Sequence, residues 1–163
     1  MIVFIRIDDR LIHGQVVEGW VNFLKATCLI VADDTVASNA LQRSIMELSV
    51  PEGLKVFIGS IEKTCEQLRT SVLDSERAIL LFSNPTDVLR ALNAGMECRS
   101  LNIGGMHFVA GKRKLIDVLA VNDNDVTALR EIVGKGVKIV IQTVPTQRPI
   151  PLGKVLNVCS IEK

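Results

Sequence analysis

One stretch, MIVFIRIDDRLIHGQV at residues 1–16, sets the fold of this chain. Its apolar start, residues 2–6, is short enough for a buried strand. The run from residue 15 to residue 25 has its apolar side chains on one helical face. Between these two runs lies a charged segment with a single histidine. The stretch therefore predicts a strand, a charged loop at its carboxyl end, and a helix.

The same alternation of strand and helix continues along the remaining sequence. Further strands are expected at residues 28–32, 55–58, 78–82, 100–103 and 137–142, and helices at 35–50, 60–72, 84–95 and 124–133. The apolar positions Leu41, Ile45 and Leu48 are expected to face inward. Residues 106–121 fit either a hairpin or an extended excursion, and a terminal edge strand is expected near residues 155–159.

Alternating units of this kind predict one α/β domain over residues 1–163. Its sheet should be open, mostly parallel and doubly wound, with helices on both faces and an antiparallel edge strand. Hydrophobic residues make up 48% of the chain and aromatic residues only 4%. Such a composition is typical of parallel strands that are buried on both faces.

Charge and cysteine content exclude several function classes. The net charge is +1, and without a polybasic run or a set of exposed aromatics we expect no nucleic-acid partner. No metal site and no cofactor are expected either, because Cys28, Cys65, Cys98 and Cys159 lack metal-ligand spacing. Reduced, mostly buried thiols are typical of a cytoplasmic protein.

The charged loop suits transfer of a phosphoryl group through His13. A histidine that accepts such a group needs a neutral ring nitrogen, which is available at cellular pH because an unperturbed histidine has a pKa of about 6.5. The ring also needs access for a donor and an acceptor, which a tight loop provides. Positioning and charge stabilisation dominate this chemistry, and Arg10 offers a planar fork of donors. We therefore expect His13 as the carrier and Arg10 as its stabilising partner.

The residues on either side of His13 support the same chemistry. If the helix begins at Gly14, Gln15 and Val16, their backbone N–H groups and the helix dipole favour an anion there. Gly14 has no Cβ, so a large group can approach closely.

Arg6, Asp8 and Asp9 have roles that the residues alone leave open. Arg6 either binds phosphate, holds the loop or pairs with Asp8. One aspartate orients the imidazole or the arginine, and the other caps the turn; the pattern does not say which is which.

Three further positions follow other strands of the predicted sheet. Ser83 follows the fourth strand, and Gly104 and Gly105 follow the fifth. Ligands in such sheets bind outside the carboxyl ends of the strands, so all three should border the His13 loop. His107 lacks an adjacent arginine pair and is expected to be structural, at the border of the site.

Residues 6–16, RIDDRLIHGQV, resemble the signature of the IIB component of the mannose/fructose/sorbose family of bacterial sugar phosphotransferase systems. Asn102-x-Gly104-Gly105 and the order of strands and helices support this resemblance over nearly the whole chain. It implies that His13 is the phosphorylated residue, that Arg10 stabilises the phosphate, and that the reaction is that of a protein-N-phosphohistidine–sugar phosphotransferase.

The resemblance also implies partners and a place of action. A IIA protein, expected as a separate polypeptide, donates the phosphoryl group from its own phosphohistidine. His13 then passes it, by analogy through Nδ1, to a sugar held by the membrane components IIC and IID. The protein is expected in the cytoplasm, peripherally associated with this permease. The sugar, a homodimer, and a regulatory role without transport are left open.

Rival readings from other classes fit the sequence less well. A response-regulator receiver needs an aspartate after the third strand and a lysine after the fifth, where this chain has Ser60 and Gly104. A dinucleotide-binding domain needs GxGxxG after the first strand. A non-catalytic interaction module leaves the loop around His13 unexplained.

Overall fold

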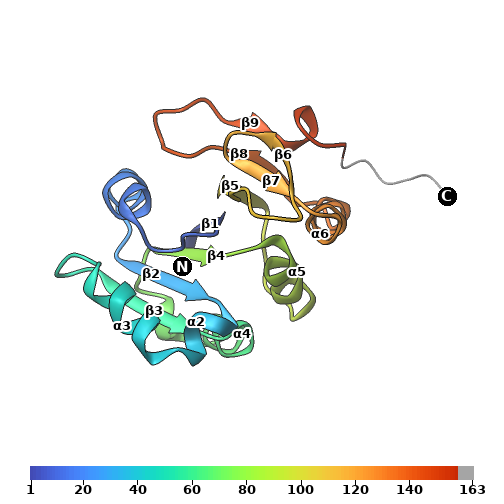
Figure 1. The fold of residues 1–163 in the computed structure, drawn as a ribbon. Helices are drawn as coiled ribbons and strands as arrows, with labels where there is room; N and C mark the ends of the chain where they lie inside the picture. Colours follow the sequence, from blue (N-terminus) through green and yellow to red (C-terminus); the bar gives the residue numbers. More distant parts are fainter. Residues whose placement is uncertain (158–163) are drawn as a thin grey trace.

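Seven strands form the central sheet of the computed structural model, which describes residues 1–157. Their order is β3–β2–β4–β1–β5–β8–β9 (Figure 1). The strands are β1 Ile2–Asp8, β2 Cys28–Ala32, β3 Lys55–Gly59, β4 Ala78–Phe82, β5 Ser100–Gly105, β8 Lys138–Ile141 and β9 Ile150–Pro151. All pairings are parallel except that of β8 with β9. The predicted open, mostly parallel sheet with an antiparallel edge strand is confirmed.

Helices cover both faces of this sheet because successive side chains of a strand point to opposite sides. In β4, Leu80 and Phe82 belong to one hydrophobic core, whereas Ile79 and Leu81 belong to a second core on the other face. The first core includes side chains of α4 (Ile61–Leu68), α5 (Pro85–Asn93) and α6 (Asp123–Gly134). The second includes side chains of η1 (Gln15–Trp20), α1 (Val21–Leu24) and α2 (Asp34–Ser38). The sheet is therefore doubly wound, as predicted.

The first strand lies in the middle of the sheet, between β4 and β5. From β1 the chain builds β2, β3 and β4 on one side and then β5 and β8 on the other. Ligands of open α/β sheets bind at the carboxyl ends of the strands where the strand order reverses in this way. The segment that follows β1 therefore occupies the position expected for a ligand site.

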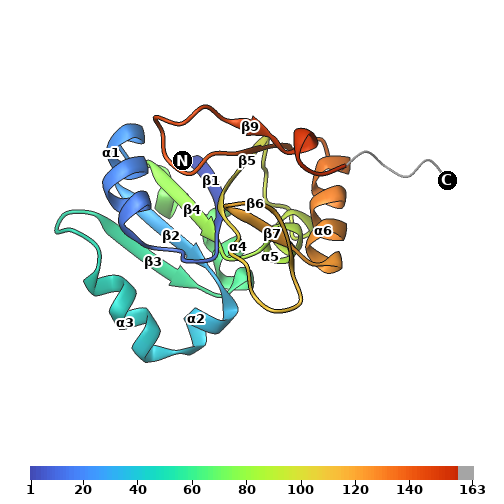
Figure 2. The same ribbon diagram turned by 45° about the horizontal axis from the view of Figure 1, so that its top comes forward.

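The second helical region differs from the prediction. A single helix was expected, but Asn39 has an extended backbone, and its side chain accepts a hydrogen bond from Gln42 N–H to begin α3 (Ala40–Leu48). Leu41, Ile45 and Leu48 are 70%, 57% and 85% exposed, so the prediction that they face inward is wrong. The helical phase does not continue through Asn39, and α3 lies at the margin of the molecule (Figure 2).

The C-terminal prediction is wrong for residues 155–157. The edge strand is β9, and the short helix η3 (Leu152–Lys154) follows it. Leu152 and Leu156 are buried in the first core, so the apolar run that suggested a strand reflects burial alone. Residues 158 and 159 of the expected strand lie outside the described residues.

The segment at residues 106–121 is a hairpin rather than an extended excursion. Its antiparallel strands are β6 (Arg113–Ile116) and β7 (Leu119–Val121). The helix expected to reach residue 72 ends at Leu68, and η2 (Ser71–Leu73) follows it. Within residues 1–157, no helix is long and apolar enough to cross a membrane.

Candidate functional site

The site begins inside β1, which runs two residues further than predicted. Arg6 and Asp8 are alternate residues of this strand, so both point to the side opposite Ile7. Neither is exposed, and the Arg6 Nη2 atom lies 2.9 Å from Asp8 Oδ2. The Arg6 guanidinium also lies 5.6 Å from the centre of the buried Trp20 ring on η1. The Arg6–Asp8 ion pair therefore stabilises the end of β1, and the contact of Arg6 with Trp20 joins this strand to the helix that follows the loop.

Both terminal nitrogens of Arg6 are hydrogen-bonded in the interior, whereas its buried Nε has no partner within the described residues. Its Nη1 donates to Asn102 Oδ1 at 2.6 Å and to Gln142 O at 2.9 Å, and its Nη2 donates to Thr143 O at 3.1 Å. Burial lowers the pKa of the guanidinium, and the adjacent Asp8 carboxylate opposes this effect. Of the roles left open for Arg6, the structure favours pairing with Asp8 and holding the loop from behind.

Gly104 and Gly105 make room for the side chains of the site. A Cβ atom at Gly104 would lie 1.8 Å from Arg6 Cζ, so only glycine leaves space for the guanidinium. A Cβ at Gly105 would lie 2.8 Å from His107 Cε1 and 3.4 Å from Asp8 Oδ1. The two glycines thus border the site as expected, and their part in it is to let Arg6 and His107 pack closely.

The turn after β1 carries backbone strain. Leu11 N–H donates to Asp8 O at 2.9 Å, which closes a turn over residues 8–11. Leu11 has a φ of 56°, an uncommon conformation for a residue other than glycine. Its side chain is buried in the second core, which holds the turn in place. Strain of this kind is often found at functional sites.

His13 lies over this turn, with both ring nitrogens near oxygen atoms. Nδ1 is 3.0 Å from Leu11 O, and Nε2 is 3.6 Å from Asp8 Oδ2. The side chain is 16% exposed, which is less than expected for a residue that must meet two partners. Nδ1 can attack an electrophile only after it has moved away from Leu11 O, whereas the buried Nε2 makes no hydrogen bond within the described residues.

Arg10 faces the same carboxylate from the solvent side. Its Nε lies 3.2 Å from Asp8 Oδ1, its Nη2 lies 2.9 Å from Gln15 Oε1, and the side chain is 38% exposed. Asp8 therefore contacts Arg6 and Arg10 and faces His13. The two aspartates do not divide the roles as expected: Asp8 contacts the Arg10 side chain and also accepts the Arg10 backbone N–H in the turn, whereas Asp9 binds His107.

The helix after His13 starts differently from the prediction. Val16 and Val17 N–H both donate to His13 O at 3.0 Å, so the Val16 N–H group is already bonded. The N–H groups of Gly14 and Gln15 in this first turn are better placed to bind an anion. A Cβ at Gly14 would meet no atom within 4 Å other than those of its chain neighbours, so the start of the helix is open at this position. The first six helical residues, η1, form a π-helix, which sequence periodicity does not reveal.

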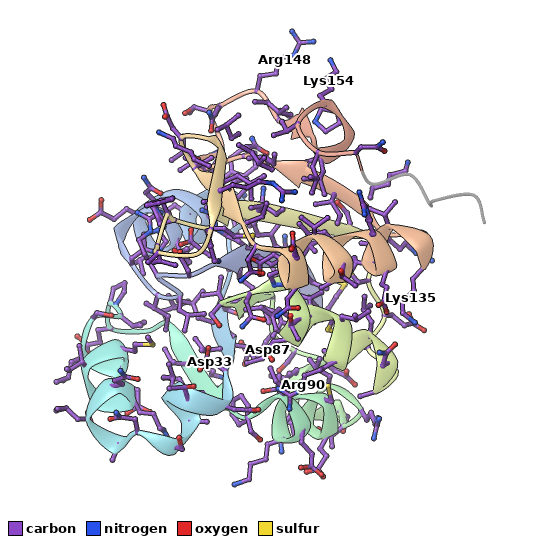
Figure 3. The ribbon with its side chains drawn as sticks, turned by 45° about the vertical axis from the view of Figure 1, so that its right-hand side comes forward. Asp33, Asp87, Arg90, Lys135, Arg148 and Lys154 are labelled. Atoms are coloured by element: carbon purple, nitrogen blue, oxygen red, sulfur yellow. The ribbon has the colours of Figure 1, made fainter. Side chains whose placement is uncertain are left out.

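Ser83 lies near the site but belongs to a second polar network. It borders, together with Asp9, a pocket of about 310 Å³. Its hydroxyl donates to Asp33 Oδ2 at 2.6 Å, and the network continues through Asn84 to Asp87 and Arg90 (Figure 3). The Ser83 hydroxyl therefore serves this network rather than the turn over residues 8–11.

The arrangement is that of an α/β protein with a histidine, an arginine and the start of a helix at the carboxyl end of its central strand. His13 can act as a nucleophile, while Arg10 and the first N–H groups of η1 can stabilise a bound anion. The chain belongs to the sorbose subfamily of IIB components of the sugar phosphotransferase system, since the model of the PTS system sorbose subfamily IIB component matches residues 2–163.

Known proteins match this sequence over most of its length. The N-acetylgalactosamine-specific phosphotransferase enzyme IIB component 2 of Escherichia coli K12 is 34% identical over 155 residues, 95% of this chain and 98% of the relative. The mannose-specific EIIAB component of the same organism is 33% identical over 86% of this chain and 44% of its own length. The crystal structure of the IIBSor domain of the Klebsiella pneumoniae sorbose permease matches with a TM-score of 0.91 and 32% identity over 98% of both chains. The chain is accordingly a phosphotransferase subunit of a sugar uptake system.

Proposed function

We propose that His13 accepts a phosphoryl group from a phosphohistidine on a IIA protein and passes it to a sugar. The observation that carries this proposal is the position of His13, at the carboxyl end of β1 beside Arg10 and the first turn of η1. The reaction class is that of a protein-N-phosphohistidine–sugar phosphotransferase. The subunit acts in the cytoplasm, where it associates with the membrane components IIC and IID that hold the sugar. The EIIAB name of the mannose-specific relative supports a IIA partner.

The transfer has two displacement steps at phosphorus. In the first, the lone pair of a neutral His13 nitrogen forms a new P–N bond while the P–N bond to the donor histidine breaks, and the donor nitrogen keeps the electron pair. In the second, a sugar hydroxyl oxygen attacks, its proton is released, and the His13 nitrogen leaves. For transfer at Nδ1, this nitrogen must first leave the carbonyl of Leu11.

Arg10 supplies the charge stabilisation for both steps, and this gives a first prediction. We expect Arg10→Ala to slow phosphorylation of His13 by about 10²- to 10³-fold, the usual loss when one donor to a developing charge is removed. Arg10→Lys should be intermediate because it keeps the charge and loses the fork. Quenched time courses with phosphoramidate as a small-molecule donor measure these rates.

The exposed Arg148, which lies between β8 and β9, offers a matched control (Figure 3). Arg148→Ala should keep the wild-type rate. An unchanged rate in Arg10→Ala would remove the role of the arginine and leave that of His13 intact.

The site of modification tests the proposal itself. The wild-type protein is incubated with phosphoenolpyruvate, the two general phosphotransfer proteins and a IIA protein, and its intact mass is measured before and after mild acid. We expect one acid-labile phosphoryl adduct. The chain contains only two histidines, so peptide mapping decides between His13 and His107. An adduct on His107, or none although the IIA protein is charged, would contradict the proposal.

A further inference from the structure

Asp9 is fastened to the end of β5 by three hydrogen bonds. Its backbone N–H donates to Gly105 O at 3.0 Å. Its carboxylate accepts the backbone N–H of His107 at Oδ2, at 2.6 Å, and the His107 ring nitrogen Nδ1 lies 2.5 Å from Oδ1. Both carboxylate oxygens are thus occupied by one residue that lies 98 positions further along the chain. The residue directly before Arg10 is therefore tied to the neighbouring strand.

The imidazole of His107 lies beside the site rather than in the core. A Cβ atom on Gly105 would be close to both His107 Cε1 and Asp8 Oδ1. The His107 ring and the Asp8 carboxylate therefore both lie next to this glycine. The His107 side chain is 43% exposed. Packing in the interior therefore does not explain a histidine at this position. The specific contact of the His107 ring is its bond to Asp9.

The bond matters because the turn over residues 8–11 carries Arg10 and leads directly to His13. Arg10 belongs to this turn, and Leu11 O is the atom that holds the His13 ring. The buried Leu11 side chain anchors one end of the turn. The backbone of Leu11 is strained, so without further contacts the turn would shift toward a less strained conformation. Asp9 anchors the exposed part of this turn through its bonds to His107. A displacement of about 1 Å in such a group can slow a reaction by up to about 10²-fold.

We propose that His107 is a positioning residue for phosphoryl transfer, which it serves by binding Asp9 through Nδ1 and so fixing the turn that carries Arg10 and leads to His13. This inference rests on the function proposed above. His107 itself does not touch the transferred group.

Three substitutions at one position test this role. The amide nitrogen of Asn can take the place of His Nδ1, whereas that of Gln reaches one bond further, to the place of Nε2. With phosphoramidate as the donor, we expect His107→Asn to keep the rate of His13 phosphorylation within about threefold of wild type, and His107→Ala and His107→Gln to lower it by about tenfold or more at saturating donor.

A double-mutant cycle checks that the effect passes through Asp9. If the two residues act as one unit, Asp9→Ala combined with His107→Ala should be no slower than the slower of the two single variants. A wild-type rate in His107→Ala, a His107→Asn variant as slow as His107→Ala, or additive effects in the cycle would each overturn the proposal.

Stability must be separated from positioning in these variants. Thermal unfolding is measured for each, and if His107→Ala does not fold, the comparison of His107→Asn with His107→Gln decides alone. Wild-type protein that takes up no phosphoryl group on His13 would refute the proposed function instead. The two failures therefore give different results.

Discussion

Gly104→Ala is expected to lose several kcal/mol of folding stability and to be largely insoluble. The new Cβ would lie 1.8 Å from Arg6 Cζ and Nη2, and Arg6 is wholly buried. Overpacking a core costs about 1–3 kcal/mol. Here the guanidinium would also have to leave Asp8, and breaking a buried ion pair costs about 3–5 kcal/mol. The total free energy of unfolding of a protein domain is about 5–15 kcal/mol. Urea unfolding followed by circular dichroism measures the loss.

Gly134→Ala is the matched control for this substitution. Gly134 is the last residue of α6, and a Cβ there would meet nothing within 4 Å. Alanine has the higher helix propensity, so the control should be as stable as wild type or more stable by up to about 1 kcal/mol. A free energy of unfolding of Gly104→Ala within about 1 kcal/mol of wild type would mean that the Arg6 guanidinium can adopt another position. It would contradict the role of Arg6 in holding the loop.

The strands of this protein were predictable because parallel strands that are buried on both faces appear as uninterrupted apolar runs. The expected ranges at residues 28–32 and 78–82 match β2 and β4. The exposed stripe on α3 was not predictable in the same way. Asn39 fits inside a helical pattern, and only the three-dimensional structure shows that it ends one helix and caps the next.

The candidate site was predictable in outline, because the order of the strands places every loop that follows a strand at one edge. This rule placed His13, Arg10 and Gly105 near one another before any contact was known. It could not assign Asp8 and Asp9 separate partners, since the partner of Asp9 lies 98 residues away. The strand was predicted to end at residue 6, so the alternation that points Asp8 to the same side as Arg6 became clear only from the structure.

His13→Ala is expected to abolish phosphorylation and to leave the fold intact. The fold should survive because Asp8 keeps both Arg6 and Arg10 when the ring is removed, and the hydrogen bond that the ring gives up is the one between Nδ1 and Leu11 O. The free energy of unfolding should therefore change by about 1 kcal/mol or less.

The loss of phosphorylation should be complete because no other group can replace the ring. The only other histidine, His107, has its Nδ1 bound by Asp9. Intact mass after incubation with the charged IIA protein measures the adduct, and His107→Asn, which keeps His13, serves as the control that must still carry it. An acid-labile adduct on folded His13→Ala would assign the transfer to another residue, and the arrangement of Arg10 and Asp8 would then need a different explanation.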